Sequence, residues 1–98
     1  MTISKIAYIY ANPESIQPLQ QALLDLEAAT LLEPGCIFFS FYQSLSDKKN
    51  FVLIECFADQ QALEQHMQLP HTVHFFGLNL VQSIVVSEMA QNNLPKTP

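Results

Sequence analysis

Three histidines lie in the segment HMQLPHTVHFF, and the chain contains no others. An imidazole titrates near neutral pH, so these side chains could act as general bases or as metal ligands. His66, His71 and His74 are spaced five and three residues apart, and Pro70 interrupts the helical face on which they would lie. Helical zinc ligands favour steps of about three or four residues. The spacing therefore predicts no metal site here.

Glu55 is the one charged residue of the strand-like segment FVLIECF. The alternation of a strand places it on one face with three apolar neighbours, namely Phe51, Leu53 and Phe57. An unpaired buried carboxylate costs several kcal/mol, so Glu55 should be protonated, paired or near water. His66 is the polar member of an apolar helical stripe, and we expect it to contact Glu55. Such a pair could serve as a general base at a pocket wall or as a structural hydrogen bond.

His71 follows Pro70 at the start of a short predicted helix, which favours a position on the pocket wall. The candidate catalytic residues are therefore His66, His71 and Glu55. Strand tyrosines usually pack in a core, but a hydroxyl that opens onto a cavity can orient a substrate oxygen. The candidate substrate pocket comprises Tyr8, Tyr10, Tyr42, Phe57 and His74.

The elements that must position these residues follow from the apolar periodicity. Strands are expected at residues 3–11, 36–45, 51–57 and 81–88, and helices at 15–32, 60–68 and 71–79. Pro34 and Gly35 end the first helix, and Asp59 is the expected cap of the second. A short polar turn joins the second and third strands into a hairpin. The order β-α-β-β-α-β predicts an α+β protomer of the ferredoxin-like class.

Both faces of the predicted sheet are apolar. We expect Ile37, Phe39 and Phe41 on one face of the second strand, with Phe38 and Tyr42 on the other. The chain is 49% hydrophobic and 13% charged, whereas charged residues usually make up about 25%. Helices can cover one face only, so a second copy packed sheet to sheet is the simplest cover for the other. The alternative is a sheet that tolerates exposed apolar groups.

The 98 residues predict one domain, over residues 1–90, followed by a flexible tail at 91–98. The net charge is −5 and every basic residue is a lysine, which argues against nucleic-acid binding and against an anionic membrane surface. No signal peptide and no apolar run of about 20 residues is present. Cys36 and Cys56 lie in apolar runs, where thiols act as small hydrophobes. These features predict a cytoplasmic protein.

The block from Glu33 to Phe76 resembles the antibiotic biosynthesis monooxygenase (ABM) domain family. The matching features are Glu33-Pro34-Gly35-Cys36 before the hairpin, Phe51 and Glu55 in the next strand, Asp59 and Ala62 at the start of the helix, then His66 and Pro70-His71. With the flanking strands, the resemblance covers residues 3–88. It implies one ABM-like domain and a homodimer whose two sheets meet as a dimeric α+β barrel.

The resemblance also implies a range of activities. Some members of the family oxidise quinols or phenols with dioxygen and no cofactor, others degrade haem, and others process a phosphorylated autoinducer sugar. The absence of tryptophan and arginine from this chain disfavours the second and third groups. Our first hypothesis is a cofactor-independent monooxygenase that binds a small apolar or aromatic quinol or phenol, with His66 or His71 as the base. The alternatives are a dimeric small-molecule-binding or stress-related protein without catalysis, and an isomerase of a small hydroxy-ketone.

Overall fold

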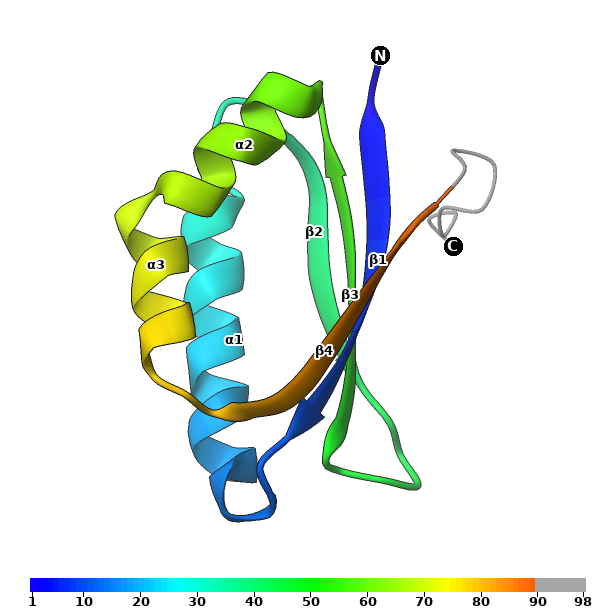
Figure 1. The fold of residues 1–98 in the computed structure, drawn as a ribbon, viewed down its shortest axis with the longest axis vertical. Coiled ribbons are helices and arrows are strands. Elements are labelled where there is room, and N and C mark those ends of the chain that lie inside the picture. The colour runs from blue at the N-terminus through cyan, green and yellow to red at the C-terminus, as the bar shows by residue number, and fades with distance from the viewer. Residues whose placement is uncertain (90–98) are drawn as a thin grey trace.

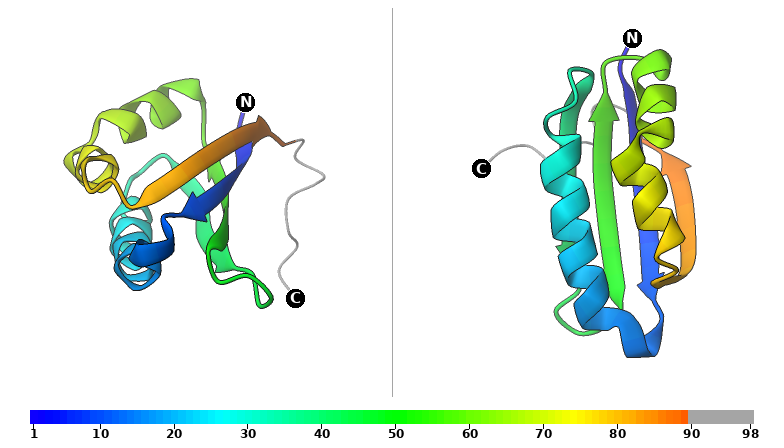
Figure 2. Two further views of the ribbon diagram at one scale, coloured as in Figure 1. Left: turned by 60° about the horizontal axis from the view of Figure 1, so that its bottom comes forward. Right: turned by 90° about the vertical axis from the view of Figure 1, so that its left-hand side faces the viewer.

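A computed structural model describes residues 1–89 as a four-stranded antiparallel sheet with all three α-helices on one face (Figures 1 and 2). The elements in chain order are β1 (Ile3–Ala11), a 3-10 turn (Pro13–Ser15), α1 (Ile16–Thr30), β2 (Cys36–Gln43), β3 (Asn50–Phe57), α2 (Gln60–Gln68), α3 (Pro70–Gly77) and β4 (Val81–Glu88). The predicted order is confirmed. The predicted tail at 91–98 lies outside the described residues.

The strand order in the sheet is β2-β3-β1-β4, so β1 and β3 are central and β2 and β4 are the edges. β2 and β3 pair as the predicted hairpin, and Ser44 N–H donates to the Asn50 carbonyl at 2.9 Å where the turn closes. This arrangement confirms the ferredoxin-like α+β class. It also brings the inner-face residues of all four strands beneath the helices.

The core lies between the helices and the inner face of the sheet. α1 buries Leu19, Leu23, Leu26 and Thr30, which recur at the spacing of one helical face. They pack with Ala7, Ile9 and Ala11 of β1 and with Phe51, Leu53 and Phe57 of β3. Strand alternation puts the neighbours of these residues on the opposite face. Tyr8, between the buried Ala7 and Ile9, is 49% exposed there.

The predicted assignment of the β2 side chains to the two faces of the sheet is wrong at Ile37. A β-bulge between Cys36 and Phe38 leaves Ile37 without a partner on β3, because Cys36 pairs with Phe57 and Phe38 with Cys56. One inserted residue breaks the alternation of side chains. Ile37 is therefore exposed, while Phe39 is buried on the inner face as predicted.

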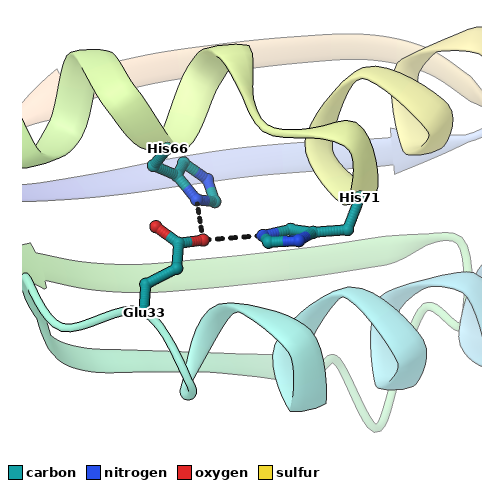
Figure 3. A group of neighbouring side chains, drawn as sticks. All are labelled: Glu33, His66 and His71. Carbon is teal, nitrogen blue, oxygen red and sulfur yellow. Dashed lines mark hydrogen bonds and ion pairs between the residues drawn. The ribbon is translucent and has the colours of Figure 1, made fainter.

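The chain bends sharply between α2 and α3, at Leu69 and Pro70. Asp59 caps α2 as predicted, and its Oδ1 accepts from the Ala62 backbone N–H at 2.8 Å. Leu69 is extended, with ψ 149°, as is usual before a proline, and Pro70 then begins α3. The bend turns His71 of α3 back toward His66 at the end of α2 (Figure 3).

No helix among residues 1–89 is long and apolar enough to span a membrane.

Candidate functional site

One oxygen of Glu33 links two of the three histidines. Its Oε2 lies 2.8 Å from His66 Nδ1 and 2.7 Å from His71 Nε2 (Figure 3). The Glu33 side chain is only 9% exposed and that of His66 only 4%, whereas that of His71 is 27% exposed. The group is therefore closed on the His66 side and open to solvent on the His71 side.

Three separate segments bring these side chains together. Glu33 lies in the turn after α1, where its N–H donates to the Thr30 carbonyl at 3.0 Å and its carbonyl accepts from Cys36 N–H at 3.1 Å. These two bonds fix the backbone from which the carboxylate points toward α2 and α3. Gly35 allows the same turn to approach α2, because a Cβ at this position would overlap the Cβ of Ala62.

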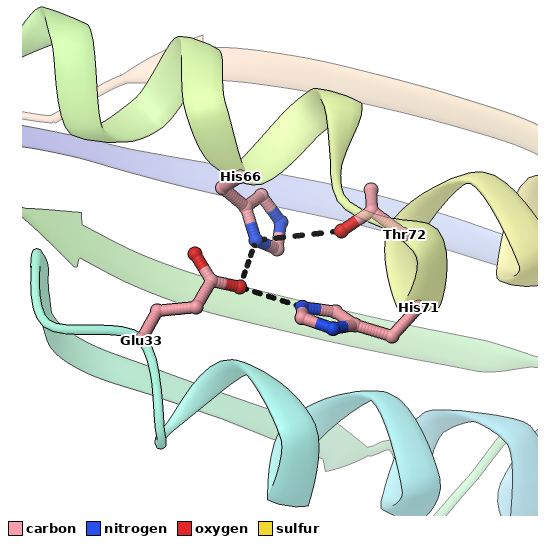
Figure 4. Close-up of polar contacts among 4 residues, drawn as sticks. All are labelled: Glu33, His66, His71 and Thr72. Carbon is pink, nitrogen blue, oxygen red and sulfur yellow. Dashed lines mark hydrogen bonds and ion pairs between the residues drawn. The ribbon is translucent and has the colours of Figure 1, made fainter.

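The hydrogen bonds determine which ring nitrogens carry hydrogen. An ionised carboxylate can only accept, so His66 Nδ1–H and His71 Nε2–H are the donors. A neutral His66 ring then has its lone pair on Nε2. Nε2 has no hydrogen-bond partner within residues 1–89. The Thr72 hydroxyl is 3.5 Å from His66 Nδ1 and adds a weak polar contact (Figure 4).

Aromatic rings hold the His66 imidazole in place. Its centroid lies 4.9 Å from that of Phe57 and 5.4 Å from that of Phe39. Phe57 thus supports the candidate base directly. The polar contact to Glu33 and the flanking rings together restrict the rotation of His66.

His66 and Glu55 border one small cavity of about 90 Å³ between the sheet and the helices. The cavity wall is otherwise almost entirely apolar and is formed by Ala7, Ile9, Leu26, Phe39, Phe41, Leu53, Met67, Thr72, Phe75, Phe76, Ile84 and Val86. An apolar enclosure of this kind strengthens the electrostatic interactions of its few polar groups. Glu55 and His66 are thus the two ionisable side chains that line this cavity within the described residues.

The predicted contact between His66 and Glu55 is replaced by the contact between His66 and Glu33. No hydrogen bond joins His66 to Glu55 within the described part of the chain. Burial raises the pKa of Glu55 to about 7, against the smaller lowering effect of Lys5, its cross-strand neighbour on β1, and Glu33 raises it slightly further. Glu55 is therefore a carboxyl that is partly protonated near neutral pH.

His71 and His74 border a different hollow. A groove of about 650 Å³ runs between α1 and α3, and its wall includes Asp25, Pro70, His71, His74 and Phe75. His71 reaches from this groove to Glu33, while His74 has no contact with the Glu33 group. Of the three candidate catalytic residues, His66 and Glu55 thus share the interior cavity, and His71 is joined to His66 through Glu33.

None of the three candidate tyrosines lines the interior cavity. Tyr8 is exposed on the outer face of the sheet, and Tyr42 borders a groove between α1 and the edge strand β2. Tyr10 is half-buried near the hairpin turn, where its hydroxyl lies 3.4 Å from Asp47 Oδ2 and Lys49 Nζ lies 5.3 Å from its ring. The sequence does not predict the position of Glu33 in the site. The one indication in the sequence that Glu33 has a role is its place in the Glu33-Pro34-Gly35-Cys36 motif.

Comparison with known proteins identifies a matching family and several similar solved structures. Residues 2–77 match the family described as "Antibiotic biosynthesis monooxygenase". A solved structure described as an antibiotic biosynthesis monooxygenase is 26% identical, with a TM-score of 0.84, and the match covers 97% of this chain and 100% of that one. PA3566 from Pseudomonas aeruginosa is 28% identical, with a TM-score of 0.86, over 92% of this chain and 93% of that one.

A curated relative, the uncharacterised protein sll1783 from Synechocystis, is 37% identical over 43 residues. The match covers 44% of this chain but only 29% of that protein. This chain therefore spans less than a third of that relative's length, and the similarity says nothing of the remainder.

Proposed function

This chain belongs to the antibiotic biosynthesis monooxygenase family, and from that premise we propose that it oxidises a small quinol or phenol with dioxygen and without a cofactor. His66 is the general base in this proposal. The observation that carries it is the hydrogen bond from His66 Nδ1 to Glu33, since this bond leaves the Nε2 lone pair of a cavity-lining ring free to accept a proton.

The reaction begins with proton transfer from the substrate hydroxyl to His66 Nε2, which forms an electron-rich phenolate. A ring carbon of the phenolate then reacts with dioxygen to give a hydroperoxide at that carbon. Loss of water from the hydroperoxide and the ring C–H leaves a carbonyl and so a quinone. One oxygen atom enters the product, the other leaves as water, and the substrate supplies all the electrons.

Glu33 and Glu55 have different roles in this scheme. Glu33 keeps Nδ1 protonated and stabilises the imidazolium that forms when Nε2 accepts the substrate proton. Glu55 has a pKa of about 7, so a fraction of it can donate a proton to the oxygen that departs as water. The apolar wall around both groups reduces the access of bulk water.

The size of the cavity restricts the substrate. About 90 Å³ is room for dioxygen or a few waters, and it is below the ~150 Å³ of a known engineered cavity that admits benzene. Several apolar residues of the wall are also solvent-exposed, namely Met67, Phe76, Ile84 and Val86. A single-ring substrate would therefore lie partly across this open rim.

A second copy of the chain would cover what the helices leave bare. Exposed apolar side chains on the strands include Tyr8, Ile37, Tyr42 and Val85, in addition to Ile84 and Val86 at the cavity rim. A sheet-to-sheet homodimer would bury the apolar side chains of the outer face, which include Tyr8 and Val85. Sedimentation of the purified protein at micromolar concentration should give twice the protomer mass, and Val85→Lys should shift it toward the monomer.

An isomerase that shuttles protons on a hydroxy-ketone is the second candidate. The shared cavity of Glu55 and His66 favours it, because such a reaction needs two proton-transfer groups close to one substrate. Exchange of carbon-bound hydrogen for deuterium without oxygen uptake would select this candidate.

The test of the monooxygenase is oxygen uptake with a panel of small quinols and phenols in the presence of a chelator. His66→Ala should reduce turnover by about 100-fold or more, the usual contribution of a general base. Gln61→Ala, an exposed change on the same helix, is the control and should retain full activity. With labelled dioxygen, one labelled atom should enter the product. Uptake that is equal in wild type and His66→Ala would rule out His66 as the base.

A further inference from the structure

We propose that Glu33, His66 and His71 form a binding site for a transition-metal ion of the zinc class. The ligand atoms would be the Glu33 carboxylate, His66 Nδ1 and His71 Nε2, which all lie within 4.8 Å of one another (Figure 3). Two histidines and one carboxylate are a recurrent set for catalytic zinc and for non-haem iron.

The residue spacing that argued against a metal applies only to ligands on one continuous helix. The bend at Leu69-Pro70 turns α3 so that His71 faces back toward His66, although five residues separate them. The third ligand comes from the turn after α1 and is remote in sequence. The fold thus assembles a three-ligand set that no local pattern displays.

The distances need only small adjustments to accept an ion. Glu33 Oε2 lies 2.8 Å and 2.7 Å from the two nitrogens, and zinc–nitrogen bonds are about 2.1 Å long. An ion at the present position of Oε2 would thus be about 0.7 Å too far from each nitrogen. Inward movement of the two rings, together with withdrawal of the flexible Glu33 side chain, closes this difference and leaves the carboxylate as the third ligand.

The donor set and the surroundings select the type of ion. Two imidazole nitrogens favour Zn²⁺, Co²⁺ or Ni²⁺ over Mg²⁺ and Ca²⁺, which prefer oxygen ligands. The carboxylate supplies a negative charge where burial makes it most effective. The ion can enter through the groove between α1 and α3, since His71 lines that groove and is partly exposed.

Metal binding and the base role of His66 exclude each other, a consequence that rests on the proposed function. A neutral His66 ring that binds metal through Nδ1 carries its hydrogen on Nε2, which can then no longer accept a proton. Stoichiometric metal should therefore suppress oxygen uptake, and a chelator should restore it.

The binding test uses the full chain without a histidine tag and needs neither substrate nor oxygen. Calorimetric titration with Zn²⁺ should give one ion per protomer, and Co²⁺ should produce visible absorption bands. His71→Gln keeps an N–H donor for Glu33 but removes a metal ligand. We expect His71→Gln to weaken Zn²⁺ binding by about 100-fold or more. Loss of a residue that only hydrogen-bonds to a metal ligand can already weaken binding by up to about 100-fold, and loss of a ligand should cost at least as much.

His74→Gln is the matched control, because His74 is an exposed histidine on the same helix and lies outside the group of Glu33, His66 and His71. The Zn²⁺ affinity of this variant should stay within twofold of wild type. Glu33→Gln is the second variant and should weaken binding to a similar extent, with folding checked by circular dichroism. Equal affinity in wild type and His71→Gln would overturn the site, as would the absence of saturable binding. Loss of binding in Cys36→Ser, with binding intact in His71→Gln, would assign the ion to a thiolate instead.

Discussion

Glu33 Oε2 accepts a hydrogen bond from His66 Nδ1 at 2.8 Å, and the two residues are 33 positions apart in the chain. The same oxygen accepts from His71 Nε2 at 2.7 Å. A single carboxylate thereby connects the turn after α1 to both helices that cover the cavity. It also fixes the orientation of the one imidazole that borders that cavity.

Removal of the Glu33 charge should destabilise the fold. Glu33→Gln can keep one oxygen as the acceptor for both ring N–H groups, but it removes the negative charge that strengthens these two hydrogen bonds. Hydrogen bonds to a charged group are worth about 1.5–3 kcal/mol, so we expect a loss of this order in urea unfolding with a chelator present. Glu64→Gln, at an exposed site on α2, is the control. A Glu33→Gln protein as stable as that control would show that the carboxylate has no structural role.

Glu55 should make stability depend on pH in a definite direction. Its pKa rises from 4.5 to about 7 on folding, so between these values the folded state holds a proton that the unfolded state has released. The stability that Glu55 contributes is therefore complete below pH 4.5 and is lost as the pH rises through about 7. At about 1.4 kcal/mol per pKa unit, the difference is about 3 kcal/mol.

Glu55→Gln removes this dependence. Its free energy of unfolding relative to wild type should increase by up to about 3 kcal/mol between pH 4.5 and pH 8. The comparison of wild type with variant at each pH cancels the contributions of other groups. Parallel pH profiles for the two proteins would contradict a raised pKa at Glu55.

Gly35 should not tolerate a side chain. A methyl group here would overlap Ala62 Cβ, so Gly35→Ala should cost about 1–3 kcal/mol in thermal or urea unfolding. The double variant Gly35→Ala/Ala62→Gly removes the overlap and should recover part of the loss, although glycine within α2 itself costs about 1 kcal/mol. A double-variant cycle with no coupling would show that the turn and the helix do not touch as described.

Asp59 should contribute to the stability of α2 through its cap. Asp59→Ala removes the acceptor for the Ala62 N–H and should cost about 1 kcal/mol. Asp59→Asn retains an acceptor and should cost much less. Equal losses in the two variants would point to the charge of Asp59 rather than to its hydrogen bond.

Features that depend on local sequence could be predicted from it. The 60–68 helix and the 81–88 strand have the predicted bounds, because Asp59, Pro70 and the apolar alternation mark them directly. The element order β-α-β-β-α-β, predicted from the apolar periodicity, is also observed. The identification of His66 and Glu55 as polar residues on inward faces also required only periodicity, and both are buried.

Features that depend on tertiary contacts could not be predicted. Glu33 reads in the sequence as part of a helix stop, and nothing local indicates that its side chain turns toward residues 33 and 38 positions away. The bulge at Ile37 has no glycine to mark it. The three tyrosines were expected at a pocket, but none lines the interior cavity. A tyrosine in a strand-like segment does not itself indicate which face of the strand meets the helices.

The most direct test of the central claim is the protonation state of the two ring nitrogens of His66. Long-range proton–nitrogen correlation spectra of labelled, chelator-treated protein distinguish the tautomers at a pH where the ring is neutral. We predict hydrogen on Nδ1 and an unprotonated Nε2 in wild type, with this preference weakened in Glu33→Gln. Hydrogen on Nε2 in wild type would mean that the ring cannot accept a proton from a ligand in the cavity, and the assignment of His66 as the base would be wrong.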